Sequence, residues 1–115
     1  MYIAQFTPEA VEDIRKLPKN VRNALQKKFR DTILKDPAGC SDALTEPLES
    51  FRSFHFGKYR VVYRIYADWN AIAVVGIGKK SGRHQSDVYK KLAVLAGTGK
   101  LADTILKTLR LFSAP

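Results

Sequence analysis

The clearest structural signal in the sequence is a β-hairpin formed by residues 50–56 and 59–66. Apolar and polar side chains alternate on both sides of Gly57-Lys58, and a two-residue loop that begins with glycine is a strong hairpin signal. This loop sets the register of the two strands. The expected cross-strand pairs are Phe56–Tyr59, His55–Arg60, Phe54–Val61 and Ser53–Val62.

Side chains alternate between the two faces of a strand, so the register also sorts the hairpin into faces. One face is predicted to be an apolar core that contains Phe54, Phe56, Tyr59, Val61 and Tyr63. The other face is predicted to be polar and cationic, and it carries Ser53, His55, Arg60, Val62 and Arg64. Antiparallel sheets commonly have one packed and one solvated face, so the second face is either simply hydrated or a binding surface.

The N-terminal part of the chain predicts a strand followed by a helical hairpin. Residues 2–6 are expected to form the strand, and Thr7 is expected to cap a helix that Pro18 interrupts. A second helix is predicted from about residue 20 to 35. It is expected to end there because Asp36 precedes Pro37, and a residue before proline disfavours helical backbone. Residues 37–47 are expected to be loop.

The C-terminal part predicts a central strand and two further helices. Residues 71–78 are almost all apolar, which is typical of a strand covered on both faces. A helix capped by Ser86 is expected to run to about residue 96, and a last amphipathic helix from residue 100 to 112. Residues 1–115 are therefore predicted to be one α+β domain, with helices on one face of a mostly antiparallel four-stranded sheet and with 97–115 as a C-terminal helical extension.

The charge balance indicates what the protein binds. The chain has 20 Lys and Arg against 11 Asp and Glu, a formal net charge of +9, so a polyanion or an acidic protein is an expected partner. The single cysteine, Cys40, fits a reducing compartment. The N-terminus lacks a secretion signal, and no apolar run has membrane-spanning length. A cytoplasmic protein without a membrane partner is therefore expected.

The polar residues of the hairpin and of the loop after the central strand suggest metal-independent RNA cleavage. His55 and Arg60 are expected to be cross-strand neighbours, and antiparallel pairing would bring Lys80 and His84 to the same end of the sheet. Attack by the RNA's own 2′-hydroxyl, which leaves a cyclic phosphate, needs a base, an acid and cations around the phosphate. The sequence contains no spaced carboxylate cluster, zinc motif or phosphate-binding glycine loop, so neither a metal nor a cofactor is predicted.

The order of these motifs resembles the RelE/ParE toxins of type II toxin–antitoxin systems. The hairpin SFHFGKYRVVYRI, which ends at Ile65, is similar to their RLRVGDYRVIYRI segment. The segments beginning at Gly76 and Ser86 resemble their closing VGKR and S-x-V-Y motifs. The similarity extends over about residues 2 to 92 and implies a RelE-like fold.

For the RelE branch, the resemblance implies cleavage of mRNA on the ribosome and inhibition of translation. By position, Arg60 corresponds to an arginine that contacts the scissile phosphate, Lys80 to a second catalytic arginine, and Tyr89 to a tyrosine that aids the chemistry. Ser53 and His55 stand where RelE has lysines. The candidate catalytic residues are His55, Arg60, Lys80, His84 and Tyr89, and the candidate RNA-binding residues are Lys58, Arg64, Lys79 and Arg83.

The resemblance also leaves other functions open. A ParE-like toxin would inhibit DNA gyrase without being a nuclease, since a shared fold does not determine function. An inactive homologue would act only in antitoxin complex formation and operator binding. In each case the expected partner is a cognate antitoxin, with a heterotetramer as one possible assembly, that covers the toxin with an amphipathic helix or an added strand. The active form would also bind the ribosome and mRNA. Trp69 is expected to cover the core or to contact a partner, and a base-stacking role is the alternative.

Overall fold

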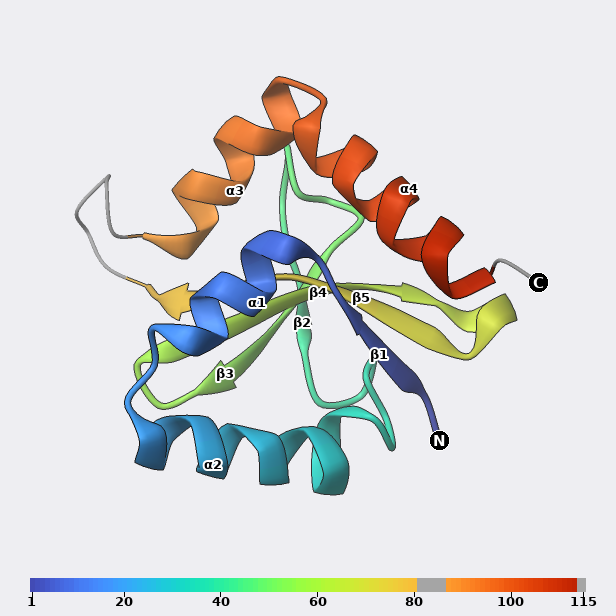
Figure 1. The fold of residues 1–115 in the computed structure, drawn as a ribbon. Coiled ribbons are helices and arrows are strands. Elements are labelled where there is room, and N and C mark those ends of the chain that lie inside the picture. Colours follow the sequence, from blue (N-terminus) through green and yellow to red (C-terminus); the bar gives the residue numbers. More distant parts are fainter. Residues whose placement is uncertain (81–86, 114–115) are drawn as a thin grey trace.

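The computed structural model describes residues 1–80 and 87–113, with side chains as far as Thr108. It is an α+β fold built on one five-stranded sheet in the order β1-β5-β4-β3-β2 (Figure 1). The elements in chain order are β1 (Ile3–Phe6), α1 (Pro8–Arg15), α2 (Lys19–Lys28), the π-helical η1 (Phe29–Ile33), β2 (Asp42–Ala43), β3 (Arg52–Phe56), β4 (Tyr59–Tyr66), the 3₁₀ turn η2 (Ala67–Trp69), β5 (Ala71–Lys79), α3 (Val88–Gly97) and α4 (Lys100–Ser113).

The predicted hairpin register is confirmed. Strands β3 and β4 pair antiparallel with Phe56 opposite Tyr59 and His55 opposite Arg60. Gly57, in the turn between them, has φ of +59°, a conformation that glycine adopts without strain. Strand β5 pairs antiparallel with β4 and parallel with β1, so the sheet is mostly antiparallel as expected.

The sheet has five strands rather than the four expected. The additional strand, β2, consists of only two residues, with Asp42 opposite Ser53 and Ala43 opposite Arg52. It lies within the segment that was predicted to be loop. A two-residue strand has no periodic pattern of its own, because it exists only by pairing with the edge of β3.

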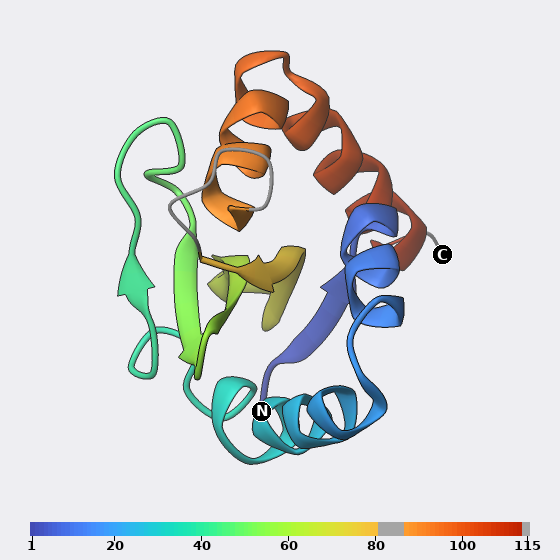
Figure 2. The ribbon, with the colours of Figure 1, turned by 90° about the vertical axis from the view of Figure 1, so that its left-hand side faces the viewer.

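Helices cover both faces of the sheet, which corrects the prediction that they pack on one face (Figure 2). Residues of α1, α2 and η1, among them Ala10, Leu25 and Phe29, pack with Phe54, Val61 and Tyr63 in one core cluster. The second cluster lies on the opposite face, under α3 and α4. It contains Leu48, Phe51, Val62, Ala73, Val75, Val88, Leu92, Leu101 and Ile105.

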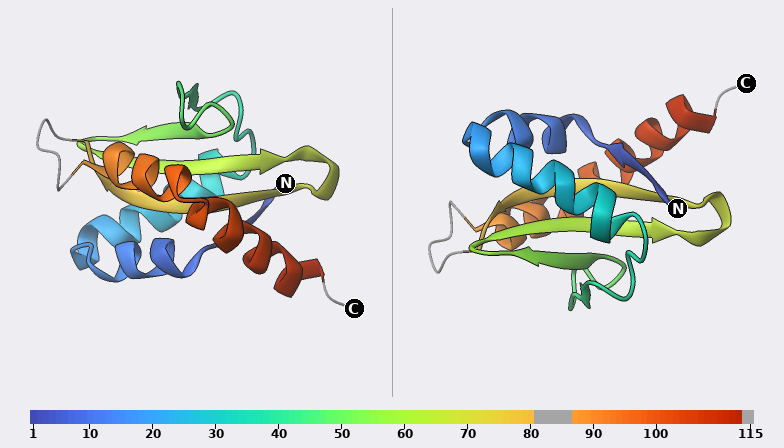
Figure 3. Two further views of the ribbon diagram at one scale, coloured as in Figure 1. Left: turned by 90° about the horizontal axis from the view of Figure 1, so that it is seen from above. Right: turned by 90° about the horizontal axis from the view of Figure 1, so that it is seen from below.

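The second face of the hairpin is therefore only partly the solvated surface that was predicted. Val62 and Ser53 are buried, at 0% and 1% exposure, whereas His55 and Arg64 are exposed. The C-terminal helices exclude water from the middle of this face and leave polar side chains accessible toward the ends of the strands. Figure 3 shows α3 and α4 crossing one side of the sheet and α2 crossing the other.

The helix boundaries follow capping chemistry, with one correction. Thr7 caps α1 as expected, because its hydroxyl accepts a hydrogen bond from the Ala10 N–H at 3.2 Å. The N-cap of α3 is Asp87 rather than the predicted Ser86, which lies outside the described residues. The Asp87 carboxylate accepts from the Tyr89 N–H at 2.8 Å, and a negative charge suits the start of a helix. None of the described helices is both long and apolar enough to span a membrane.

Helix α3 approaches β5 closely because two glycines face it. A β-carbon placed on Gly76 would come within 3.0 Å of a Leu92 methyl group, and one on Gly78 within 3.3 Å of the Val88 β-carbon. These distances are at or below the limit for carbon contacts in a packed interior. The position of α3 on the sheet therefore depends on Gly76 and Gly78, which have no side chains. The side chains in the first turn of α3 are positioned in the same way.

Asp13 covers the part of the β5 edge that β1 does not reach. The paired residues of β1 and β5 end at Phe6 and Val74, and the Asp13 carboxylate then accepts a hydrogen bond from the Ile77 N–H at 3.0 Å. Lys91 of α3 lies 4.0 Å away from the same carboxylate. Burial raises the pKa of Asp13 above 3.8, although the Ile77 N–H and the Lys91 ammonium act in the opposite direction.

We expect Asp13→Ala to destabilise the protein by about 1–3 kcal/mol, because the Ile77 N–H loses its acceptor. Asp13→Asn keeps an acceptor oxygen and should cost less. The raised pKa means that the Asp13 contribution to stability falls as pH rises from about 4 through the folded-state pKa. The stability of Asp13→Asn relative to the parent should therefore improve from acid to neutral pH in urea titrations. A difference that is constant with pH would contradict this assignment.

Candidate functional site

Cationic side chains gather at the end of the sheet where β3 turns into β4 and where β5 ends. The β4–β5 pairing sets Tyr59 opposite Lys79, and the Lys80 N–H donates to the Lys58 carbonyl at 3.3 Å. The Lys58 ammonium lies 5.8 Å from the centre of the Tyr59 ring. Three lysines from two segments distant in sequence therefore lie at one end of the sheet, and all three are exposed.

His55 and Arg60 form the centre of this end of the sheet. They are direct cross-strand neighbours, and Arg60 faces Gly78 on its other side. The Arg60 Nη1 donates to the Gly57 and Tyr59 carbonyls, each at 2.8 Å, which holds the guanidinium against the turn. Its Nε is buried and has no hydrogen-bond partner within the described part of the chain. The His55 side chain is 55% exposed and accessible to a ligand.

Asp42 is a neighbour of His55 that the sequence did not reveal. Its Oδ2 lies 3.7 Å from the His55 Nε2, close enough for an ion pair when the histidine is protonated. Both side chains are exposed, so the pair contributes little to stability. Asp42 stands beside His55 only because β2 pairs with β3, and no residue pattern in the loop indicated that pairing.

A partly buried polar network holds the segment that carries Asp42. The Tyr63 hydroxyl and the Ser41 hydroxyl each donate to the Pro37 carbonyl at 2.6 Å. Arg52 donates from Nε to the Ser41 hydroxyl at 2.7 Å and from Nη2 to the Ser41 carbonyl at 2.6 Å. Burial raises the pKa of Tyr63, so its phenol remains a hydrogen-bond donor. The network ties the start of β2 to both strands of the hairpin.

Tyr89 reaches the same face of the hairpin from the first turn of α3. Its phenol oxygen lies 2.6 Å from the Ser53 hydroxyl, a hydrogen bond in which either group can donate. Ser53 is two residues from His55 and therefore on the same face of β3. The Ser53 hydroxyl thus anchors Tyr89 on this face of the hairpin.

The described structure brings together most of the residues expected in the site. His55, Lys58, Arg60, Lys79 and Lys80 lie at one end of the sheet. His55 and Arg60 are on the face that Tyr89 reaches through Ser53, whereas Lys58 and Lys79 lie beside Tyr59, which packs on the other face. Arg64 does not join them, because it lies further along β4 with its guanidinium carbon 5.2 Å from the centre of the Tyr66 ring. Arg83 and His84 lie outside the described residues.

This arrangement contains the kinds of side chain that can assist cleavage of a phosphodiester bond. Arginine and lysine side chains can bind phosphate oxygens and offset the charge that develops on them. A histidine and a tyrosine can exchange protons with the attacking and leaving oxygens. Within the described residues, no three His, Cys, Asp or Glu side chains are grouped as metal ligands would be.

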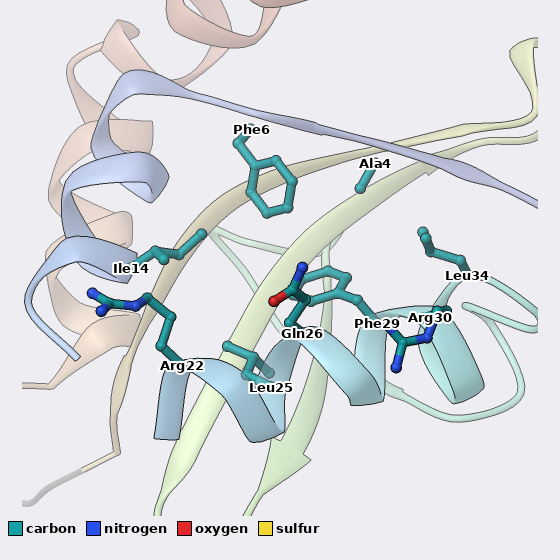
Figure 4. Close-up of a pocket in the computed structure, with 9 residues that line it drawn as sticks. All are labelled: Ala4, Phe6, Ile14, Arg22, Leu25, Gln26, Phe29, Arg30 and Leu34. Atoms are coloured by element: carbon teal, nitrogen blue, oxygen red, sulfur yellow. The ribbon is translucent and has the colours of Figure 1, made fainter. Parts of the chain in front are cut away.

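A separate apolar groove lies on the other face of the sheet, between β1 and α2 (Figure 4). Its volume is about 510 Å³, and its floor is formed by side chains such as Phe6, Leu25 and Phe29. Arg22 and Arg30 also line it, and both belong to the helical segment that borders the groove. Strand β1 is at the edge of the sheet, so its outer backbone groups are unpaired by any other strand among the described residues.

Comparison with known proteins gives a consistent family. The family of the ParE toxin of the type II toxin–antitoxin system parDE matches residues 4–83. The toxin RelE of Mycobacterium tuberculosis (strain ATCC 25618 / H37Rv) is 26% identical over 84 residues, which cover 73% of this chain and 87% of that protein.

Solved structures of toxins share the fold. The M. tuberculosis toxin–antitoxin complex RelBE2 contains a chain with a TM-score of 0.65 and 24% identity, matched over 68% of this chain and 96% of that one. The isolated E. coli RelE toxin has a TM-score of 0.59 and 26% identity, matched over 82% of this chain and 97% of that one. With the family match covering more than half of its length, the chain belongs to the RelE/ParE superfamily of type II toxin–antitoxin toxins.

Proposed function

We propose that this toxin is a metal-independent endoribonuclease that cleaves mRNA on the ribosome. The observation that carries the proposal is the grouping of His55, Arg60 and Lys80 at one end of the sheet, with Tyr89 anchored to the same face by Ser53. The net charge of +9 suits a polyanionic target. A ribosomal target also implies that the toxin acts in the cytoplasm.

Each residue has a role that its position supports. His55 is the general base that accepts the proton of the 2′-hydroxyl, because it is exposed and lies directly opposite Arg60 across the hairpin. Arg60 and Lys80 bind the scissile phosphate and offset its developing charge. Tyr89 donates to the leaving oxygen. Lys58 and Lys79 hold the flanking phosphates, while Arg83 and His84 stay proposals from sequence alone.

The proposal accounts for the departures from the RelE pattern. Ser53 carries no charge, but its hydroxyl orients Tyr89. His55 has Asp42 beside it, and a carboxylate can orient an imidazole and stabilise the imidazolium that forms during proton transfer. Lys58, Lys79 and Lys80 supply positive charge at the same end of the sheet.

Expression of the toxin in a bacterial host should produce new 5′ ends in a translated reporter mRNA, detected by primer extension. An otherwise identical message without a start codon should remain intact. His55→Ala and Arg60→Ala should each lower the cleavage rate by roughly 100- to 1000-fold, as expected for loss of a general base or of a charge-stabilising donor. Tyr89→Phe should act in the same direction.

Lys28→Ala is the matched control, because it removes an exposed lysine from α2 on the opposite face of the sheet. Its cleavage should equal that of the parent. Cuts in both messages would indicate a ribonuclease that works without the ribosome. Unchanged cleavage after loss of His55, Arg60 and Tyr89 together would overturn the proposed site.

A gyrase-directed toxin is the second candidate, favoured by the match to the ParE family. The shared fold permits either activity. Growth arrest with DNA breaks and an SOS response, and without cut mRNA, would support this function. Harmless expression would instead leave antitoxin complex formation and operator binding as the remaining role.

We infer that the cognate antitoxin places an acidic, amphipathic segment in the groove between β1 and α2. Several structures that resemble this chain are complexes of a RelE toxin with a RelB antitoxin. The unpaired edge of β1 can accept an added strand, whose alternate apolar side chains would enter the groove. Arg22 and Arg30 would then face acidic side chains of that strand, either in a simple pair or in a heterotetramer.

Reversing the groove charge with Arg22→Glu and Arg30→Glu should weaken antitoxin binding by at least about 10-fold. The measurement is calorimetric titration of the purified toxin with the protein encoded beside it. Lys27→Glu and Lys28→Glu change the net charge by the same amount on the same helix, outside the groove lining, and should have a much smaller effect. Equal weakening by both double variants would show a general charge effect and contradict the groove as the binding site.

A further inference from the structure

The turn between β4 and β5 presents an exposed tryptophan at the end of the sheet remote from His55. Trp69 is 49% exposed, an unusual position for a large aromatic ring. Figure 1 shows this turn and the β3–β4 turn at opposite ends of the sheet. Arg60 and Tyr66 are six residues apart on β4, which corresponds to roughly 20 Å of strand. Trp69 is therefore separate from the proposed cleavage site.

Trp69 is one part of a stacked row of three side chains. Its ring centre lies 6.3 Å from that of Tyr66, with the planes inclined by 33°. The Arg64 guanidinium carbon lies 5.2 Å from the Tyr66 ring centre on β4. Cation–π contact and ring packing thus order Arg64, Tyr66 and Trp69 into a row that runs from the sheet to the tip of the turn.

The turn that carries Trp69 is held in one conformation. Asn70 adopts a left-handed backbone with φ of +54°, and its N–H donates to the Ala67 carbonyl at 3.1 Å. Its side-chain amide donates to the Met1 carbonyl at 2.8 Å, and its own carbonyl accepts from the Ile3 N–H at 2.9 Å. These bonds tie the turn to β1, so little conformational freedom remains to be lost when a ligand stacks on the ring.

The chemistry of the row favours a nucleobase as its ligand. Aromatic rings bind unpaired bases by stacking, with further support from a nearby arginine. Ala67, Asp68 and Asn70, which flank Trp69 in the turn, are exposed and either small or polar, so they add little apolar area for a protein segment. The groove suited to an apolar segment lies elsewhere, between β1 and α2. The excess of positive charge favours an approaching nucleic acid strand.

We propose that Trp69, supported by Tyr66 and Arg64, is a stacking site for an unpaired base of single-stranded RNA. It is a second RNA contact at the far end of the sheet, and it rests on the proposed function only in taking RNA as the ligand. Through it, the toxin would hold its RNA target at two places, by phosphate contacts near Arg60 and by base stacking at Trp69.

Tryptophan fluorescence reports on this site alone, because Trp69 is the single tryptophan of the chain. We would titrate the purified toxin with a short single-stranded 2′-O-methyl RNA, which cannot be cleaved by 2′-hydroxyl attack, and follow the tryptophan fluorescence. Stacking should quench it on binding. The matched probe is an abasic strand of the same length, with the same phosphates and no bases, which should bind more weakly and leave the fluorescence nearly unchanged. Equal quenching by the two strands would overturn the proposal.

Substitutions provide a second readout, the anisotropy of a labelled RNA. Trp69→Ala should weaken binding by about 5- to 100-fold, and Trp69→Phe should recover much of the loss. The slope of affinity against salt should not change, because no phosphate contact is removed. Val94→Ala, which truncates another exposed apolar side chain on α3, should bind like the parent. Unchanged affinity of Trp69→Ala would also overturn the proposal.

The two proposals can fail separately. His55→Ala should lower cleavage by roughly 100- to 1000-fold and leave the quenching intact, while Trp69→Ala should weaken RNA binding and leave the cleavage residues in place. Quenching without any mRNA cleavage in cells would support the stacking site and remove the nuclease. Cleavage of mRNA, together with Trp69 fluorescence that RNA bases do not change, would support the nuclease and overturn the stacking site.

Discussion

The pairing of β4 with β5 is the constraint on which the rest of the structure depends. Val61, Val62 and Tyr63 are completely buried in β4, and residues 71–74 are completely buried in β5, so both faces of this pair are inside the protein. A charged side chain at the middle of this pair would be buried on either face, and removing it from water would cost a large amount of free energy. The charged residues of the pair, Arg60, Arg64 and Lys79, therefore lie toward the strand ends and away from this buried middle. There the two ends carry different chemistry, with lysines and a histidine at one and an aromatic row at the other.

Much of the fold was predictable because local patterns and turn chemistry agreed. The Gly57-Lys58 loop set the hairpin register, and that register was enough to place His55 beside Arg60. Antiparallel pairing correctly brought Lys79 and Lys80 to the same end. Thr7 and Pro18 marked helix boundaries, because capping and the missing proline N–H act within a few residues.

The features that were missed depend on contacts between distant segments. Ser53 was assigned to a polar face that could be simply solvated, yet it is buried and its hydroxyl is hydrogen-bonded to Tyr89 of α3. The covering of the second face by these helices is a tertiary effect that strand alternation cannot reveal. Asp42 reaches His55 through a two-residue strand, and the Asp87 cap replaced Ser86 as the start of α3. Arg64 was grouped with His55 and Arg60 because it shares their face, and strand alternation does not show that it lies further along β4, beside Tyr66.

Gly76 and Gly78 show how a residue without a side chain can determine the geometry of a site. They let α3 lie so close to β5 that an added methyl group would meet Leu92 or Val88. The first turn of that helix carries Tyr89, whose hydroxyl reaches Ser53 at 2.6 Å. The distance between α3 and the sheet thus determines the position of the Tyr89 phenol oxygen. In related chains, replacing such a glycine would then change activity although the glycine does not contact a substrate and every chemically reactive side chain is retained.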